Sequence, residues 1–316
     1  MLKTALIVCF VVINLPIQNE ATESPIIGIL VQETSPYING KFPNHNAYLA
    51  ASYVKYVESS GARVVPIFIN QTKSYYRKII QSINGVLLPG GNTWFSNKDG
   101  YADAGDIIYK LIKEENENGN TYPILGICLG FELLIYLDAS KTDIRTNCSS
   151  VDKALNLHLQ ENYNDSKIFK SAPKELIRIL EKENVTYNSH RYCITEENVK
   201  KNKLDKFWRV VAWNMDNSKA VEFVSILESV KYPFLGLQFH PEKNIFEWNK
   251  KKNVPHSANA ILVGRYFSDW LVKEARRNQN RFITKTLEKS ALIYNYQPFH
   301  TGLKGIAFDQ MYFFKI

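Results

Sequence analysis

The sequence has few cysteines, and its histidines are scattered. Four cysteines occur in 316 residues, and no Cys-x-x-Cys pair is among them. This is not a disulfide-stapled domain, so its stability has to come from a buried hydrophobic core. The six histidines lack the tight spacing that is typical of metal ligands, so we predict no metal site.

Apolar runs long enough for a membrane helix are missing after the first residues. At the start, Lys3 precedes an apolar run from Ala5 to Leu15, and a polar stretch follows to Ser24. This order is typical of a secretory signal peptide, so we predict a leader over residues 1–24 and no membrane span after its removal. The alternative is an uncleaved N-terminal anchor. Four glycosylation sequons agree with secretion, at Asn70, Asn147, Asn164 and Asn184.

Cys9 would leave with the leader, and three cysteines would remain. An odd number leaves at least one thiol unpaired or paired with another chain. Cys128 is the natural free thiol for the reasons given below. Cys148 and Cys193 are able to form a disulfide, but the sequence does not decide whether they do.

Acidic residues are fewer than basic ones, and the formal net charge is +8 with a pI of about 9.1. Nucleic acid is one reason for a basic surface, but the only dense basic run is Lys250–Lys252 and no nucleic-acid motif accompanies it. We therefore predict no nucleic-acid partner. An acidic small-molecule substrate also profits from a positive surface.

Apolar runs and helical periodicities alternate through the first half of the chain. A continuous apolar run such as 26–31 is typical of a buried parallel strand, whereas the spacing of apolar residues over 46–60 predicts a helix. The pattern predicts an α/β fold with a mainly parallel sheet. The expected strands are 26–31, 64–69, 85–88, 123–127, 209–213, 220–227 and 234–239, and the expected helices are 46–60, 74–82, 102–115 and 257–276.

Gly126-Ile127-Cys128-Leu129-Gly130 is the most informative passage. It joins an apolar run to an apolar helical segment, which indicates a strand, a sharp turn and a helix. A thiol at such a turn is exposed at the end of the strand, and the helix N-terminus favours its thiolate form. We therefore predict that Cys128 is a nucleophile, although most free cysteines are simply buried small side chains.

A second passage, Gln238-Phe239-His240-Pro241-Glu242, supplies a base and a carboxylate. His240 at the end of a strand is the predicted general base, and Glu242 would orient its imidazole. Since the nucleophile and the base lie in different halves of the chain, residues 25–316 are predicted to form one catalytic domain. The backbone N–H groups of Gly91, in a Pro-Gly-Gly turn, and of Leu129 are the predicted oxyanion donors.

The weakest candidate is Asn188-Ser189-His190, which taken alone indicates a solvated loop. Together with the other passages, however, it completes a set of motifs. Their order resembles that of the gamma-glutamyl hydrolase family, within the class I glutamine amidotransferase-like superfamily. The resemblance runs from Ile26 to the C-terminus. It rests on 89–91, 126–132, 188–190 and 238–243, and extends to 246–248, 256–260 and 291–294. One departure from the pattern is Asn92-Thr93-Trp94, after the glycine pair.

The resemblance implies a three-layer αβα sandwich and hydrolysis of gamma-glutamyl bonds in folate and antifolate poly-gamma-glutamates, through an acyl-enzyme on Cys128. It implies substrate-binding roles for His190 and Glu132, no cofactor, a lysosomal, vacuolar or secreted location, and a homodimer. Two alternatives stay open at this point. One is a glutaminase that delivers ammonia to a synthetase, and the other is a binding homologue with an inactive site.

Overall fold

The computed structural model describes residues 22–316. The predicted leader therefore lies outside the described residues except for its last three positions. No helix within the described part of the chain combines the length and the apolar character that a bilayer crossing requires.

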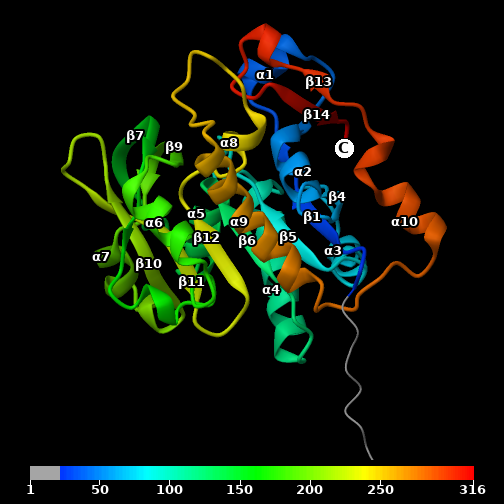
Figure 1. Cartoon of the computed structure of the whole chain (residues 1–316). Coiled ribbons are helices and arrows are strands. Elements are labelled where there is room, and N and C mark those ends of the chain that lie inside the picture. Colours follow the sequence, from blue (N-terminus) through cyan, green and yellow to red (C-terminus); the bar gives the residue numbers. More distant parts are fainter. Residues whose placement is uncertain (1–21) are drawn as a thin grey trace, which may run out of the picture.

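A sheet of eight strands forms the centre of the molecule (Figure 1). Its first five strands are parallel to one another, and the last three are antiparallel. The parallel strands consist of continuous apolar segments because both faces of the sheet are covered. In spatial order the strands are β4 (Arg63–Ile67), β1 (Ile26–Leu30), β5 (Gly85–Leu88), β6 (Ile124–Ile127), β12 (Phe234–Leu237), β11 (Glu222–Ser229), β10 (Trp208–Met215) and β8 (His158–Leu159).

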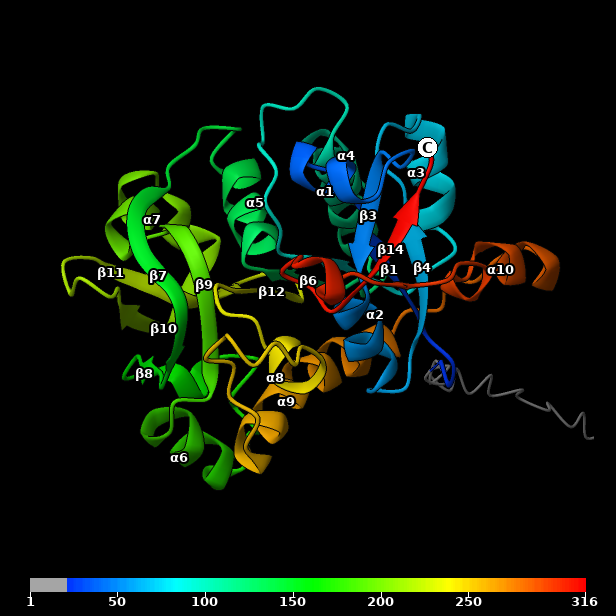
Figure 2. The same ribbon diagram turned by 90° about the horizontal axis from the view of Figure 1, so that it is seen from above.

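Helices cover both faces of this sheet and give three layers, which Figure 2 shows from above. One face carries α2 (Ala51–Glu58), α8 (Lys243–Phe246) and α9 (Ala258–Ala275). The other carries α3 (Lys73–Ile80), α4 (Tyr101–Glu117) and α5 (Leu129–Asp138). The predicted αβα sandwich around a mainly parallel sheet is confirmed.

A second sheet contradicts part of one predicted helix. Residues 46–60 were expected to be helical throughout, but Ala47–Ala50 form strand β3, and α2 begins only at Ala51. Strand β3 lies between β2 (Gln32–Glu33) and β14 (Gln310–Phe314), and β13 (Phe299–His300) completes the sheet. The pairing partner of β3 is about 260 residues away, so local periodicity does not reveal it.

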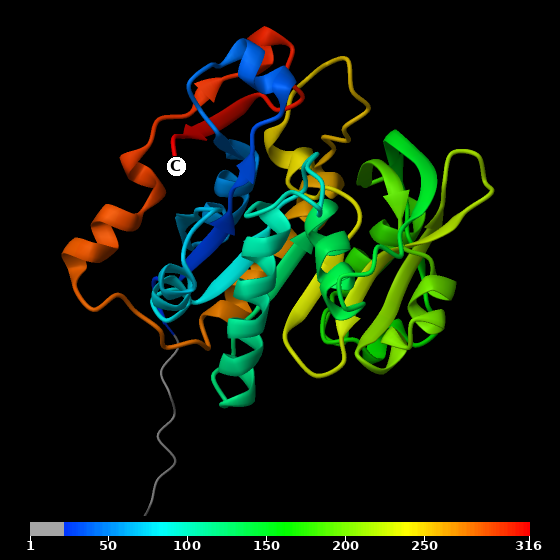
Figure 3. The same cartoon turned by 180° about the vertical axis from the view of Figure 1, so that it is seen from behind.

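A separate two-stranded ribbon corrects a further expectation. Strands β7 (Thr146–Leu155) and β9 (Thr186–Cys193) pair antiparallel beside the antiparallel end of the large sheet (Figures 1 and 3). His190, expected in a solvated loop, is a buried residue of β9. A disulfide joins Cys148 of β7 to Cys193 of β9, which settles the pairing that the sequence left open.

The remaining helices are peripheral. In Figures 1 and 3, α10 lies at the opposite end of the molecule from the β7–β9 ribbon. These helices are α1 (Pro36–Lys41), α6 (Lys174–Lys182), α7 (Glu196–Lys201) and α10 (Lys285–Ala291), with 3₁₀ turns at Tyr163–Asp165, Leu204–Lys206, Ile293–Asn295 and Gly302–Lys304.

Candidate active site

Cys128 lies at the junction of β6 and α5. Its backbone conformation is one that residues other than glycine seldom adopt. Its φ is 51° and its ψ is −109°, and its N–H donates to the carbonyl of Leu237 at 2.7 Å. Such a conformation costs on the order of 1–3 kcal/mol and persists only where the surroundings impose it. Gly130 allows the turn because a Cβ there would collide with the carbonyl oxygen of Leu88. Cys128 is also the free cysteine of residues 22–316.

His240 and Glu242 follow β12, the strand next to β6. Both side chains are buried, and His240 Nδ1 lies 2.8 Å from Glu242 Oε1. A neutral imidazole that donates its Nδ1–H to this carboxylate keeps Nε2 as an acceptor. The hydroxyl oxygen of Tyr53 lies 3.4 Å from the same Nδ1 and accepts a hydrogen bond from the backbone N–H of Gly90 at 2.9 Å.

Gly90 shows how close the nucleophile and the base are. A Cβ at this position would lie 2.8 Å from His240 Cε1 and 3.1 Å from Cys128 Cβ. Both contacts are too short for any residue except glycine to fit between them without displacing one. The fold therefore places Cys128 and His240 around a single backbone position, although 112 residues separate them in the sequence.

The electrostatics of Cys128 correct the expectation of a resting thiolate. Burial raises the pKa of the Cys128 thiol, and the carboxylates of Glu132 and Glu242 raise it further. Lys243 and the backbone N–H of Leu129 act in the opposite direction but do not offset these effects. Burial also lowers the pKa of His240, against the influence of Glu242. The site thus combines a protonated thiol with a neutral imidazole.

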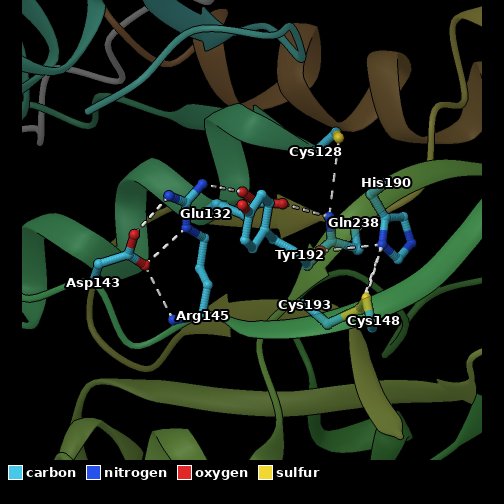
Figure 4. Close-up of polar contacts among 9 residues, drawn as sticks. All are labelled: Cys128, Glu132, Asp143, Arg145, Cys148, His190, Tyr192, Cys193 and Gln238. Carbon is cyan, nitrogen blue, oxygen red and sulfur yellow. Dashed lines mark hydrogen bonds and ion pairs between the residues drawn. A yellow bond between two sulfur atoms is a disulfide. The ribbon is translucent and has the colours of Figure 1, made fainter. Parts of the chain in front are cut away.

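A buried network connects the nucleophile to Glu132 (Figure 4). The amide nitrogen of Gln238 lies 4.0 Å from Cys128 Sγ and donates to Glu132 Oε1 at 3.1 Å. Glu132 Oε2 accepts from the Arg145 guanidinium at 2.9 Å. Burial raises the pKa of Glu132, and Arg145 opposes that rise. Arg145 is held from its other side by Asp143 at 2.7 Å.

Both ring nitrogens of His190 lie near an oxygen, and a neutral imidazole donates to one of the two. Its Nδ1 lies 3.2 Å from the carbonyl oxygen of Tyr192, and its Nε2 lies 3.1 Å from Asn188 Oδ1. Burial lowers the pKa of His190 to about 3. The ring also lies beside the disulfide, 3.6 Å from Cys148 Sγ and 3.4 Å from Cys193 Sγ. The two sulfur atoms and a ring nitrogen of His190 lie within 4.8 Å of one another, a spacing that could suit a metal ion. The sulfur atoms are bonded to each other in the disulfide, however, and not free as thiolate ligands.

A cleft of about 640 Å³ opens above the nucleophile, between the Pro-Gly-Gly loop and the β7–β9 ribbon. Five of the residues predicted from the sequence line it: Gly91, Cys128, Leu129, Glu132 and His190. His240 and Glu242 are buried and do not line the cleft. The other lining residues are Asn92, Thr93, Trp94, Arg145, Asn147, Val151, Ser189, Arg191, Tyr192 and Ala307.

Comparison with known proteins identifies the family. Residues 25–242 match the model of the peptidase C26 family. The chain belongs to the peptidase C26 family. This C26 chain is 39% identical to the gamma-glutamyl hydrolase of Mus musculus, over 94% of the chain and 91% of the relative. It is 37% identical to gamma-glutamyl hydrolase B of Dictyostelium discoideum, over 96% and 87%.

A solved structure supports the fold of this C26 chain. The glutaminase domain of CTPS from Trypanosoma brucei, with bound acivicin, superposes with a TM-score of 0.50 at 13% identity. The match covers 81% of the C26 chain and 95% of that domain. At this identity the likeness shows the shared fold.

Sequence reasoning missed Trp94, Arg145 and Tyr192 in this C26 site. Trp94 was visible only as a departure from the family pattern. Arg145 stands in an ordinary polar segment, Lys141–Asn147, and nothing in that segment marks it as a buried cation. Tyr192 enters the cleft because β9 pairs with β7, a contact between segments about 45 residues apart.

Proposed function

We propose that the chain is a gamma-glutamyl hydrolase that cleaves poly-gamma-glutamylated folates through Cys128, His240 and Glu242. The observation that carries this proposal is the placement of the free Cys128 thiol and the His240–Glu242 pair around Gly90. Membership of the C26 family and the relatives named gamma-glutamyl hydrolase give the bond type. No cofactor is needed for this chemistry.

Acylation begins with attack of Cys128 Sγ on the carbonyl carbon of the gamma-glutamyl amide. Because the thiol rests protonated, His240 Nε2 takes its proton as the C–S bond forms, and Glu242 stabilises the resulting imidazolium. The negative charge moves to the carbonyl oxygen, where the N–H groups of Gly91 and Leu129 are the proposed donors. Both residues line the cleft beside Cys128.

Collapse of this intermediate breaks the C–N bond. The imidazolium of His240 gives its proton to the departing amine of the next glutamate, and a thioester remains on Cys128. His240 then takes a proton from water, whose oxygen attacks the thioester carbonyl. The products are a free gamma-carboxylate and the regenerated thiol.

Glu132 and His190 are the proposed substrate-binding residues. Both lie in the cleft, and each is held by partners that fix its orientation. Glu132 is suited to the positively polarised N–H groups of a glutamyl residue. The net charge of +8 favours the approach of a polyanionic glutamate tail.

The proposed compartment is the secretory pathway, with delivery to a lysosome or vacuole or to the exterior. The predicted leader and the sequons support it, and all four sequon asparagines are exposed. The test is the mass of the protein secreted from eukaryotic cells before and after enzymatic removal of N-glycans. No change in mass would refute glycosylation. A homodimer is also proposed, and light scattering after size exclusion tests it.

The decisive experiment is incubation of the purified protein with folate pentaglutamate and identification of the products by mass. We expect shortened folates and released glutamate or gamma-glutamyl peptides. Cys128→Ala should abolish cleavage in a folded protein, whereas Cys148→Ala with Cys193→Ala removes the disulfide, which lies outside the proposed chemistry, and should leave some cleavage. Full activity of Cys128→Ala would end the proposal.

Two further arms address the alternatives that the sequence left open. Faster release of ammonia from free glutamine than of glutamate from the folate tail would indicate a glutaminase instead. Absence of any acyl-enzyme and of turnover with either substrate would indicate a binding homologue.

A further inference from the structure

The cleft exposes an aromatic side chain that the proposed chemistry does not use. Trp94 is 59% exposed and lines the cleft together with Cys128. It belongs to Asn92-Thr93-Trp94, the segment that departs from the family pattern. An exposed indole in the wall of a concave site, beside a nucleophile, is typical of a ligand contact, because its apolar surface stays hydrated until something covers it.

The exposed indole is linked to the buried network by an edge-to-face aromatic contact and by cation–π contacts. Its ring contacts the ring of Tyr192 at 6.4 Å between centroids, with an angle of 73° between the planes. The Arg145 guanidinium lies 4.8 Å from the centre of the Tyr192 ring and 4.4 Å from that of Phe95. Arg145 in turn pairs with Glu132. Trp94 is thereby anchored to the buried network beside the nucleophile, as a preorganised contact requires.

Trp94 is also close enough to the reacting bond to influence which bond is cut. It follows Gly91, a proposed oxyanion donor, by three residues, so the two Cα atoms are separated by at most about 11 Å. A substrate group that rests on the indole therefore lies within about two glutamyl residues of the scissile amide.

We propose that Trp94 is a specificity-determining residue that stacks on a planar aryl group attached to the first glutamate of the substrate. The aryl group then places the nearest gamma-glutamyl bond at Cys128. This inference rests on the proposed function. A glutamyl tail is anionic, flexible and aliphatic, so it gains little from an indole face, whereas a flat aryl ring gains both buried area and stacking.

The test compares two substrates with the same three gamma-linked glutamates. One carries a 4-aminobenzoyl cap and the other an acetyl cap. With the wild-type protein, we expect KM to be about two- to twelvefold lower for the aryl-capped substrate, which is the range that one aromatic contact supplies. We also expect the first product by mass to be the aryl-capped monoglutamate.

Trp94→Ala should remove this preference by raising KM for the aryl-capped substrate alone, and it should spread cleavage over the other bonds. Trp94→Phe, which keeps a ring, should restore most of the preference. The matched control is Trp248→Ala, because Trp248 is equally exposed at 59% but stacks on His256 outside the cleft lining. This control should keep the wild-type ratio of KM values.

The outcomes distinguish failure of the proposed hydrolase function from failure of the proposed role of Trp94. If the wild-type protein cleaves neither substrate, the proposed function fails. If it cleaves both with equal KM, the function stands and the inference is overturned. A loss in Trp94→Ala that is equal for both caps, or a wild-type ratio that survives in that variant, also overturns the inference.

Discussion

The ion pair between Glu132 and Arg145 allows a sharp test of the buried network, through the substitution Arg145→Met. Both side chains are almost fully buried, at 4% and 6% exposure. Removal of one partner from such a pair costs about 3–5 kcal/mol when the other charge stays ionised. Protonation of Glu132 reduces this cost. Burial already raises the pKa of Glu132, and the loss of Arg145 raises it further.

The sign of the pH dependence follows from proton binding. In the variant, the folded pKa of Glu132 lies further above its ordinary value of 4.5, so at intermediate pH the folded state binds more protons than the unfolded state. The free energy of unfolding then falls as pH rises through this window. We expect Arg145→Met to lose little stability near pH 5 and about 3 kcal/mol or more near pH 8.

Urea unfolding at both pH values measures this difference. Glu132→Gln combined with Arg145→Met should recover most of the loss at pH 8, since neither charge remains. Asp143→Asn is the control, because Asp143 contacts the same guanidinium but is 51% exposed, and it should cost no more than about 1 kcal/mol. An equal loss at both pH values, or no recovery in the double variant, would refute the reasoning.

Three further outcomes are expected. Replacement of Cys148 and Cys193 by serine should lower the free energy of unfolding by about 4 kcal/mol in chemical denaturation, since the bridge closes a loop across 45 residues; a change below about 1 kcal/mol would contradict this. Gly90→Ala should lower kcat on folate pentaglutamate by about 100-fold or more, because the new methyl group displaces Cys128 or His240; wild-type turnover would show that the contacts relax freely. The acid limb of kcat/KM should lie below pH 6.5, because burial lowers the pKa of His240 and catalysis needs its neutral form; a midpoint above 6.5 would be inconsistent with His240 as the base.

Much of the sheet was predictable because its parallel strands are buried on both faces and therefore consist of apolar runs. Strands β1, β5 and β6 and helix α9 lie within a few residues of their predicted positions. The nucleophile was predictable for a related reason. The change from an apolar run to helical periodicity marks the turn at Cys128, and flanking glycines mark close packing.

The other wall of the cleft was not predictable in this way. Strand β9 buries polar residues, among them Asn188 and His190, so it lacks the apolar alternation that indicates a strand. Its conformation depends on pairing with β7 and on the disulfide. Arg145 became a buried residue only because Glu132, Phe95 and Tyr192 surround it, a consequence of tertiary structure.

The charges around Cys128 explain how a buried thiol can still react. The carboxylates of Glu132 and Glu242 disfavour a standing thiolate, whereas the ammonium group of Lys243 favours one. Transfer of the proton from Cys128 to His240 forms a thiolate and an imidazolium at the same moment. The imidazolium is stabilised by the carboxylate of Glu242, 2.8 Å away. The transfer adds no net charge to the buried site, so its cost is that of separating a pair rather than of burying an anion. The charges around Cys128 therefore favour a thiol that gives up its proton as His240 accepts it, over a thiolate that stands alone.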